Sequence, residues 1–582
     1  MPGFLGTFDY SNCTAGRIPD TESHPTTTCN CRLRVKVRTI SKFMSDKVYY
    51  EDDFYVVLIE GVLFNKDLLL ATHSTNLLSA LVVMLYREYG DTFFSVLRGS
   101  FSGLLLDKLN DKLIIFTDHI GDKAVFYSIT KSQLLFGSEL RYIADLMRNH
   151  NITYSLDLAA AYSILTYGYL VSDLTYITEA KRLRAGHYLV CECGHCTIAQ
   201  YHAFTCSPNN SLSEANIVDR IDLLFTDAVK MQIAKNAEYG YPDYSSLSAG
   251  LESRMTTFVV SSLRQRDVIT YTYSPVGYTD QITSNDIAAF LKNTRHIYQC
   301  GYTGHVLLDI DDSILSNGGL YMYYGAAVLN QYFAVLDKTN IGIIHTGQLG
   351  GVILGTYEEH GACGIVPVER DMHSRRLAST FRSLYNLDDL MREYGNRELF
   401  SIYNRGFQGI LAGANLAFQQ FTETASPFCD VEFCEFCLTI PLEMRRKHYI
   451  YDRWIMSKYP DAARFRHNGD RVIGGALNSV RKLRRDIVKL LCRNLGLSER
   501  LCTSVTPINA WEQNPNISAG LKRYCYEHIE LLSMYPELHN DCKTMFEMGT
   551  ALERNQVLTL LGVVRLLFGS HQGNDKLCDA AA

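Results

Sequence analysis

The stretch from Ser246 to Arg254 reads Ser-Leu-Ser-Ala-Gly-Leu-Glu-Ser-Arg, and its residue types could build a phosphate-binding loop. Ser248, Ala249 and Gly250 allow the backbone to turn tightly, so that successive N–H groups point into one concavity. The apolar positions from Met255 to Leu263 have helical spacing, and the N-terminal end of a helix carries partial positive charge. An ordinary N-capped helix would have the same local pattern, so the rest of the chain must decide between the two.

Composition limits the classes of protein that need to be considered. The 582 residues, 47% of them apolar, are enough for at least two domains. The formal charge is −6 with both signs spread along the chain, which argues against nucleic acid or an anionic membrane as the main partner. No apolar run reaches the ~20 residues of a membrane-spanning helix, and Met1 to Gly6 lack the features of a secretory signal. We therefore expect a cytoplasmic protein.

The 17 cysteines are scattered, and their odd number favours reduced, mostly buried thiols. Two groups could bind metal: Cys191, Cys193 and Cys196 around His195, and Cys429, Cys434 and Cys437. The first group lies in an expected hairpin, where alternate residues face opposite ways and thiols should diverge. The second lies in an apolar helical run, where cysteine acts as a small hydrophobe. We expect structural roles for both.

The N-terminal half, from Tyr49 to Tyr201, has the pattern of strands and turns with two amphipathic helices. One strand is expected over 54–59, with a turn at Glu60-Gly61, and a helix is expected over 77–86. Further strands are expected over 100–106 and 113–117. These elements predict a layered sheet with helices packed on it.

Four motifs in this half resemble those of class II glutamine amidotransferases: Leu97–Gly103, Thr117–Lys123, Phe136–Leu140 and Leu183–Tyr188. Their order and spacing are similar to those of glutamine-dependent asparagine synthetases. The resemblance implies an N-terminal nucleophile hydrolase sandwich over residues 1–205. The glutaminase residues, however, are missing. The family has a cysteine after the initiator methionine, where this chain has Pro2, and an oxyanion-stabilising asparagine where this chain has Glu60. We expect an inactive scaffold domain.

The C-terminal half follows a polar linker over 206–215 and alternates expected helices and strands. A helix is expected over 217–233, strands over 268–273 and 341–344, and a helix over 287–291. The alternation predicts a doubly wound parallel sheet, so the chain as a whole is expected to be α/β. In this context the stretch around Ser248 resembles the loop of ATP pyrophosphatases. Residues 216–582 then resemble the synthetase domain of asparagine synthetases, with a helical C-terminal region.

The resemblance implies a site for ATP and Mg²⁺. The expected nucleotide-binding residues are Leu247, Ser248, Ala249, Gly250, Leu251, Ser253, Tyr271, Thr346, Gly347 and Gln348. Glu252 is the expected metal ligand, and Arg254 or Lys447 would steady negative charge on the adenylate or the substrate. The family's second metal-binding aspartate falls at Gly351, and the acid after it at Val352. Acids that could replace the missing ligand are Asp309, Asp311, Asp312, Glu358 and Glu359.

The implied function is that of an ATP-dependent ligase without its own glutaminase, in the manner of β-lactam synthetases. Such an enzyme activates a carboxylate as an acyl-adenylate, releases pyrophosphate, and lets an amine or ammonia attack. The expected partners are a small-molecule or peptide carboxylate and an amine donor, with a homodimer or a partner subunit as further options. The alternative is a degenerate, inactive homologue that acts as a binding or structural partner.

Overall fold

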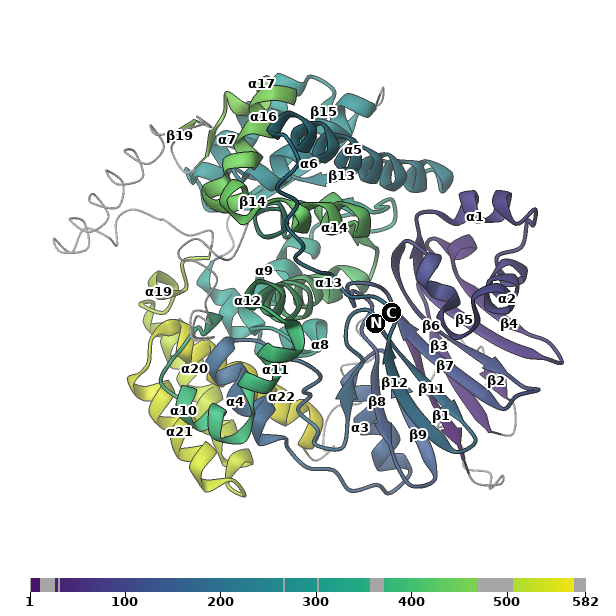
Figure 1. Ribbon diagram of the computed structural model, residues 1–582. Coiled ribbons are helices and arrows are strands. Elements are labelled where there is room, and N and C mark those ends of the chain that lie inside the picture. Colours follow the sequence, from purple (N-terminus) through teal and green to yellow (C-terminus); the bar gives the residue numbers. More distant parts are fainter. Residues whose placement is uncertain are drawn as a thin grey trace.

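The computed structural model describes residues 2–10, 27–29, 32–264, 267–300, 303–355, 371–467, 470–471 and 506–569. Its N-terminal part consists of two antiparallel six-stranded sheets (Figure 1). The first has the order β10 (Lys181–Arg182), β8 (Phe126–Ile129), β9 (Gln133–Gly137), β1 (Gly3–Asp9), β3 (Leu33–Arg38), β2 (Thr27–Cys29). The second has the order β12 (His195–Gln200), β11 (His187–Glu192), β7 (Lys112–Thr117), β6 (Gly99–Asp107), β5 (Tyr55–Leu63), β4 (Val48–Glu51).

The two sheets pack face to face, and alternation along the strands explains why. In β3, Leu33, Val35 and Val37 are buried while the basic residues between them are more exposed. These side chains share one core with Leu58 and Leu104 of the second sheet. Helices α1 (Lys66–Thr72) and α2 (Leu78–Tyr89) pack on the outer face of the second sheet, and α3 (Leu140–Asn149) packs on that of the first. The predicted layered sandwich is confirmed.

A five-stranded parallel sheet follows, with the order β15 (Thr294–Cys300), β14 (Val268–Ser274), β13 (Tyr244–Ser246), β16 (Ile344–His345), β17 (Thr424–Ala425). β14 is buried along almost its whole length, as expected when helices cover both faces. The helices against one face include α5 (Glu214–Glu238), α6 (Leu251–Leu263), α7 (Thr279–Leu291), α14 (Val431–Thr439) and α16 (Tyr449–Lys458). Against the other lie α9 (Tyr323–Phe333) and α13 (Ala412–Gln419). The doubly wound α/β architecture is therefore confirmed.

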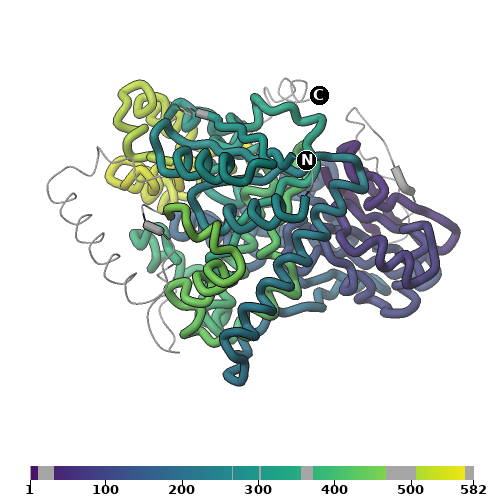
Figure 2. Tube along the Cα trace, turned by 90° about the horizontal axis from the view of Figure 1, so that it is seen from above, coloured from purple at the N-terminus to yellow at the C-terminus, as the bar shows by residue number. Residues whose placement is uncertain are grey.

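Most of the remaining helices form a bundle that combines one helix of the N-terminal half with helices of the C-terminal half. Its members are α4 (Leu158–Tyr167), α8 (Ile310–Asn317), α10 (Ala378–Leu384), α11 (Leu387–Tyr394), α12 (Arg397–Ser401), α19 (Ile508–Trp511), α20 (Pro515–His528), α21 (Pro536–Met548) and α22 (Ala551–Phe568). Helix α22 begins with a capping box between Thr550 and Glu553. Residues of α3 and α4 share one core with α8 and α20 to α22, although Figure 2 shows the purple sandwich and the yellow helices on opposite sides. The predicted boundary at 206–215 stays a prediction, because this core crosses it.

Two local expectations were wrong. The turn expected at Glu60-Gly61 is absent, because β5 continues to Leu63 with both residues paired to β6. The thiols of Cys191 and Cys196 do not diverge: the two residues are opposite each other on β11 and β12 and form a disulfide. Directly opposed residues in an antiparallel pair point to the same face of the sheet. The expectation that the thiols diverge considered only the alternation of side chains along a single strand. Cys434 and Cys437 are buried free thiols, as expected. Within the described ranges, no helix is long and apolar enough to cross a membrane.

Candidate functional site

The loop singled out by the sequence connects β13 to α6 at the carboxyl end of the parallel sheet. β13 ends at Ser246 and α6 begins at Leu251, so residues 247–250 form the loop. β13 pairs with β14 on one side and β16 on the other, and the strand order reverses there. The loop therefore lies at the switch point of the sheet, where doubly wound folds bind ligands. The predicted turn and the helix after it are confirmed, and the strand β13 before them was not predicted.

The backbone donors of this loop are held by nearby side chains. The Ser248 N–H donates to Ser253 Oγ at 3.1 Å, and the Gly250 N–H donates to Ser248 Oγ at 3.1 Å. The two serine hydroxyls are 2.8 Å apart and share a hydrogen bond. The Ala249 N–H donates to Oδ1 of Asp280 at 2.7 Å. Three successive N–H groups thus face oxygen atoms, one of which belongs to a carboxylate.

A cavity of about 470 Å³ opens beside the loop. Of the predicted nucleotide-binding residues, Leu247, Ser248, Ser253 and Tyr271 line it. Most of the remaining wall is apolar and includes Met322, Leu329, Ile410 and Ala414. Among the described residues of its wall, none is basic and the one carboxylate is that of Asp280. The cavity can hold a nucleotide-sized molecule, with polar contacts concentrated at the loop.

The second predicted loop, Thr346 to Gln348, packs against the start of α6 and does not line the cavity. The Thr256 hydroxyl donates to the Thr346 carbonyl at 3.1 Å. A Cβ on Gly347 would be 2.3 Å from the Ser253 nitrogen, so only glycine permits this approach. Ala249, Gly250 and Leu251 likewise lie outside the cavity wall. The two loops are side by side, but only the first reaches the cavity.

Glu252 lies between the two loops, and glycines surround its side chain. A Cβ on Gly347 would be 2.8 Å from the Cβ of Glu252, and a Cβ on Gly350 would be 2.8 Å from its Cγ. A Cβ on Gly351 would be 2.7 Å from its carboxylate oxygen Oε1. A Cβ on Gly250 would be 3.1 Å from both Glu252 Oε2 and Ser248 Oγ. The carboxylate is therefore aimed at the hydroxyl end of the first loop. It has no hydrogen-bond or ion-pair partner among the residues that the structure describes.

The expectation for Arg254 was wrong. Its side chain is fully buried, and its terminal nitrogens donate to the carbonyls of Ala249, Ala462, Phe465 and Arg466. Burial lowers the pKa of its guanidinium to about 10. Arg254 therefore fixes the loop to the segment after α17 (Pro460–Ala463), and it cannot reach a ligand in the cavity.

The structure does not bring Lys447 to the cavity either. Its side chain is exposed, and its backbone and that of His448 are both left-handed, with φ of 53° and 59°. His448 was missed by the sequence reasoning. Its ring carbon Cε1 is 3.5 Å from the position of a Cβ on Gly351, so the imidazole flanks the same space as Glu252. A strained pair of left-handed residues could not be read from the sequence.

None of the acids proposed as replacement ligands lines the cavity. Asp311 accepts hydrogen bonds from Tyr524 and Arg565, and Asp309 and Asp312 are on the same helix, α8, or next to it. Glu358 and Glu359 lie outside the described residues. In the described part of the chain, no group of three or more His, Cys, Asp or Glu side chains could hold a metal ion.

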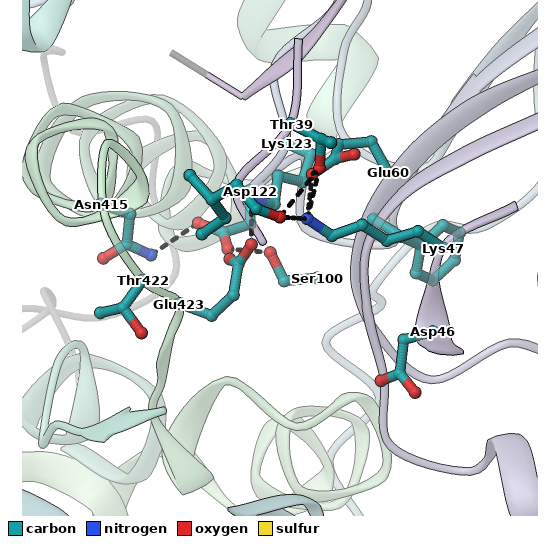
Figure 3. A network of polar contacts seen from close by, with 12 residues as sticks. Thr39, Asp46, Lys47, Glu60, Ser100, Asp122, Lys123, Asn415, Thr422 and Glu423 are labelled. Atoms are coloured by element: carbon teal, nitrogen blue, oxygen red, sulfur yellow. Dashed lines mark hydrogen bonds and ion pairs between the residues drawn. The ribbon is translucent and has the colours of Figure 1, made fainter. Parts of the chain in front are cut away.

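A second polar centre lies where the sandwich meets the parallel sheet (Figure 3). Glu60 is buried and pairs with Lys47 at 2.9 Å, and it also accepts hydrogen bonds from Thr39 and Tyr49. Lys123 pairs with Glu423 at 2.7 Å across the interface, with both side chains almost fully buried.

Beside these ion pairs, Asn415 donates to Asp122 at 2.6 Å. Burial and the neighbouring Asp122 raise the pKa of Asp118 to about 7. The carboxylate of Glu60 is thus neutralised by a lysine, and charged side chains of the two parts of the molecule hold each other.

Comparison with known proteins finds similarity to one group of proteins over part of the chain. Residues 27–202 match the model of a glutamine amidotransferase domain. Asparagine synthetase 3 of Bacillus subtilis is 26% identical over 254 residues, which cover 42% of this chain and 40% of that protein. Asparagine synthetase 1 of the same organism is 23% identical, over 40% of this chain and 36% of its own. The chain is therefore related in sequence to asparagine synthetases over part of its length.

Other similarities are more limited. An amidase of Gibberella zeae, amidase chry2, is 29% identical over 112 residues, covering 19% of this chain and 16% of that protein. The asparagine synthetase-related chain thus spans less than half the length of these curated relatives. The solved structure of an allosteric regulatory enzyme of purine biosynthesis covers 66% of this chain and 80% of its own, at 11% identity and a TM-score of 0.23. A superposition of that quality adds nothing to the architecture described above.

Asp280 is the other residue of this asparagine synthetase-related protein that sequence reasoning missed. It is the second residue of α7, at the carboxyl end of β14, the strand next to β13. Parallel strands that pair side by side bring their carboxyl ends to one edge of the sheet. The position of Asp280 shortly after β14 was therefore a feature of the sequence from which its place beside the loop could have been predicted.

Proposed function

We propose that this protein is an ATP-dependent carbon–nitrogen ligase that activates a carboxylate as an acyl-adenylate and releases pyrophosphate. The observation that carries the proposal is the 470 Å³ cavity at the switch point, with the Ser248–Ser253 loop at its polar end. Serine hydroxyls and backbone N–H groups suit phosphate oxygens, and the apolar wall beside Tyr271 suits a nucleobase. The kinship with asparagine synthetases supports a ligase of the amidotransferase family.

Glu252 is the residue proposed to hold Mg²⁺. Its carboxylate has no cation partner in the described residues and faces the Ser248 hydroxyl, so the donor set fits a hard cation. Mg²⁺ is commonly held by one or two carboxylates together with substrate phosphates, so a cage of protein ligands is not required. When bound, the ion would neutralise phosphate charge. The protein's own part is to orient the phosphates on the loop and to keep water from the apolar end of the cavity.

The nitrogen is proposed to come from free ammonia, a partner subunit or the substrate's own amine, and not from glutamine. Pro2 offers no thiol nucleophile, and the Glu60 carboxylate, which is paired with Lys47, has no N–H to donate to a developing oxyanion. Incubation with glutamine should therefore release no more glutamate than a control without the protein. Release above that control would contradict this part of the proposal.

The decisive test is exchange of labelled pyrophosphate into ATP, screened over amino acids, sugar acids and peptide carboxylates. Exchange that depends on one acid is the expected result, and Glu252→Gln should abolish it while leaving the fold intact.

The second candidate is a degenerate homologue that serves as a binding partner, and the acid missing at Gly351 favours it. This candidate replaces the first if no acid supports exchange and ATP does not bind in calorimetry.

A further inference from the structure

The loop of residues 247–250 already binds a negatively charged group, which is the carboxylate of Asp280. The Ala249 N–H donates to Asp280 Oδ1 at 2.7 Å, a distance typical of a charge-assisted hydrogen bond. Asp280 also lines the cavity, so its carboxylate occupies space that a ligand on the loop would need. The neighbouring Ser248 and Gly250 N–H groups face neutral hydroxyls. Of these three acceptors, Asp280 is the one that carries a negative charge.

Asp280 lies beside an exposed turn at the start of its helix. It is in the first turn of α7 and half-buried. The preceding turn contains Val276, which is 71% exposed, and Gly277, whose φ of +76° is left-handed and whose Cβ position meets no atom within 4 Å. A change of backbone in this turn, at the cost of the hydrogen bond from the Gly277 N–H to Gln281 Oε1, would move the carboxylate relative to the loop.

We propose that Asp280 is an internal competitor of phosphate, which keeps the loop closed to free anions and makes its occupation depend on a ligand that brings a cation. The inference rests on the proposed function, since it concerns the same loop. A phosphate on the loop and an ionised Asp280 repel each other at short range. A divalent cation between phosphate and carboxylate removes that repulsion, so a magnesium complex should displace or accommodate Asp280 where the bare anion cannot.

The test measures binding of sodium pyrophosphate by calorimetry, with and without MgCl₂, to the full-length chain and three variants. Asp280→Asn keeps an acceptor for the Ala249 N–H but removes the charge, and Asp280→Ala removes both. Asp286→Asn is the matched control, because Asp286 is an exposed acid on the same helix and does not line the cavity. Thermal melting of each variant verifies that it folds.

We expect Asp280→Asn and Asp280→Ala to bind magnesium-free pyrophosphate at least about tenfold more tightly than the wild type, as loss of one charged hydrogen bond corresponds to about that factor. Asp286→Asn should match the wild type. With MgCl₂ the difference between wild type and Asp280→Asn should shrink. Equal or weaker binding by both Asp280 variants would overturn the inference and leave the proposed function standing. If neither pyrophosphate nor ATP binds any form, the loop is no phosphate site, and the inference fails together with the proposed function.

Discussion

Replacing Lys123 by Met should destabilise the protein strongly at neutral pH and weakly in mild acid. Lys123 Nζ is 2.7 Å from Glu423 Oε1, and the two side chains are 5% and 2% exposed. Removal of the lysine leaves Glu423 buried, without a charged partner at that oxygen, and its second oxygen already lacks a hydrogen bond within the described residues. An uncompensated buried carboxylate takes up a proton rather than stay charged.

The free-energy cost of protonating Glu423 determines how much stability the variant should lose. An ordinary glutamate has a pKa of about 4.3, so protonation costs about 4 kcal/mol at pH 7 and about 1 kcal/mol at pH 5. Burial already raises the pKa of Glu423 in the wild type, against the lowering effect of Lys123, and loss of the lysine raises it further. A carboxyl with a raised folded-state pKa destabilises the fold increasingly as pH rises above its unfolded pKa. The variant should therefore lose about 4 kcal/mol at pH 7 and about 1 kcal/mol at pH 5.

Urea denaturation at both pH values, followed by fluorescence of the buried Trp454, measures this loss. The control is Lys123→Met combined with Glu423→Gln, which removes both charges and should abolish the difference between the two pH values. A loss in the single variant that is the same at pH 5 and pH 7, or below about 1 kcal/mol at pH 7, would refute the reasoning.

The remaining predictions concern the loops and a buried acid. Gly347→Ala should abolish ATP binding in calorimetry, because its Cβ would meet the start of α6 at 2.3 Å, whereas Gly406→Ala, whose Cβ would have no atom nearer than 3.7 Å and which does not line the cavity, should bind normally. Gly351→Ala should displace the Glu252 carboxylate and weaken binding of Mg·ATP, and combination with Glu252→Asp should restore part of it, since the shorter acid leaves room. Burial raises the pKa of Asp452 from 3.8 to about 7, so wild-type stability should fall as pH rises from 4 to 7. Asp452→Asn should remove the share of that dependence that comes from Asp452, leave the share of Asp118, and gain up to about 4 kcal/mol at pH 7.5 in urea denaturation, and a pH profile identical to that of the wild type would contradict it.

The sequence was sufficient for features that depend on local pattern. Small residues before an apolar periodic run predicted the loop at Ser248 and the helix after it, and alternating elements predicted the doubly wound sheet. The sequence was insufficient where contacts between segments that are distant along the chain determine the local structure. Pairing with β6 carries β5 through Glu60-Gly61, despite the local turn signal. Arg254 carries a charge, which suggested a role in the site, but carbonyls around 200 residues away hold it in the interior.

The changes at Glu252 and Gly351 have one physical explanation. The family that the sequence resembles has an aspartate at each of these positions, so either difference taken alone would suggest a damaged metal site. In the structure, Glu252 Oε1 lies 2.7 Å from where a side chain on residue 351 would begin, so an aspartate at 351 and this conformation of Glu252 exclude each other. The longer acid reaches the space that the glycine leaves, and Gly347 and Gly350 clear the path for its Cβ and Cγ. One carboxylate thus occupies the space between the loops, and the Ser248–Ser253 turn keeps its hydroxyls and backbone donors. Only the contact at Gly351 concerns the extra methylene, since an aspartate at position 252 would carry the same Cβ and Cγ beside Gly347 and Gly350, and this one complementary pair is what a site with a single acid would need.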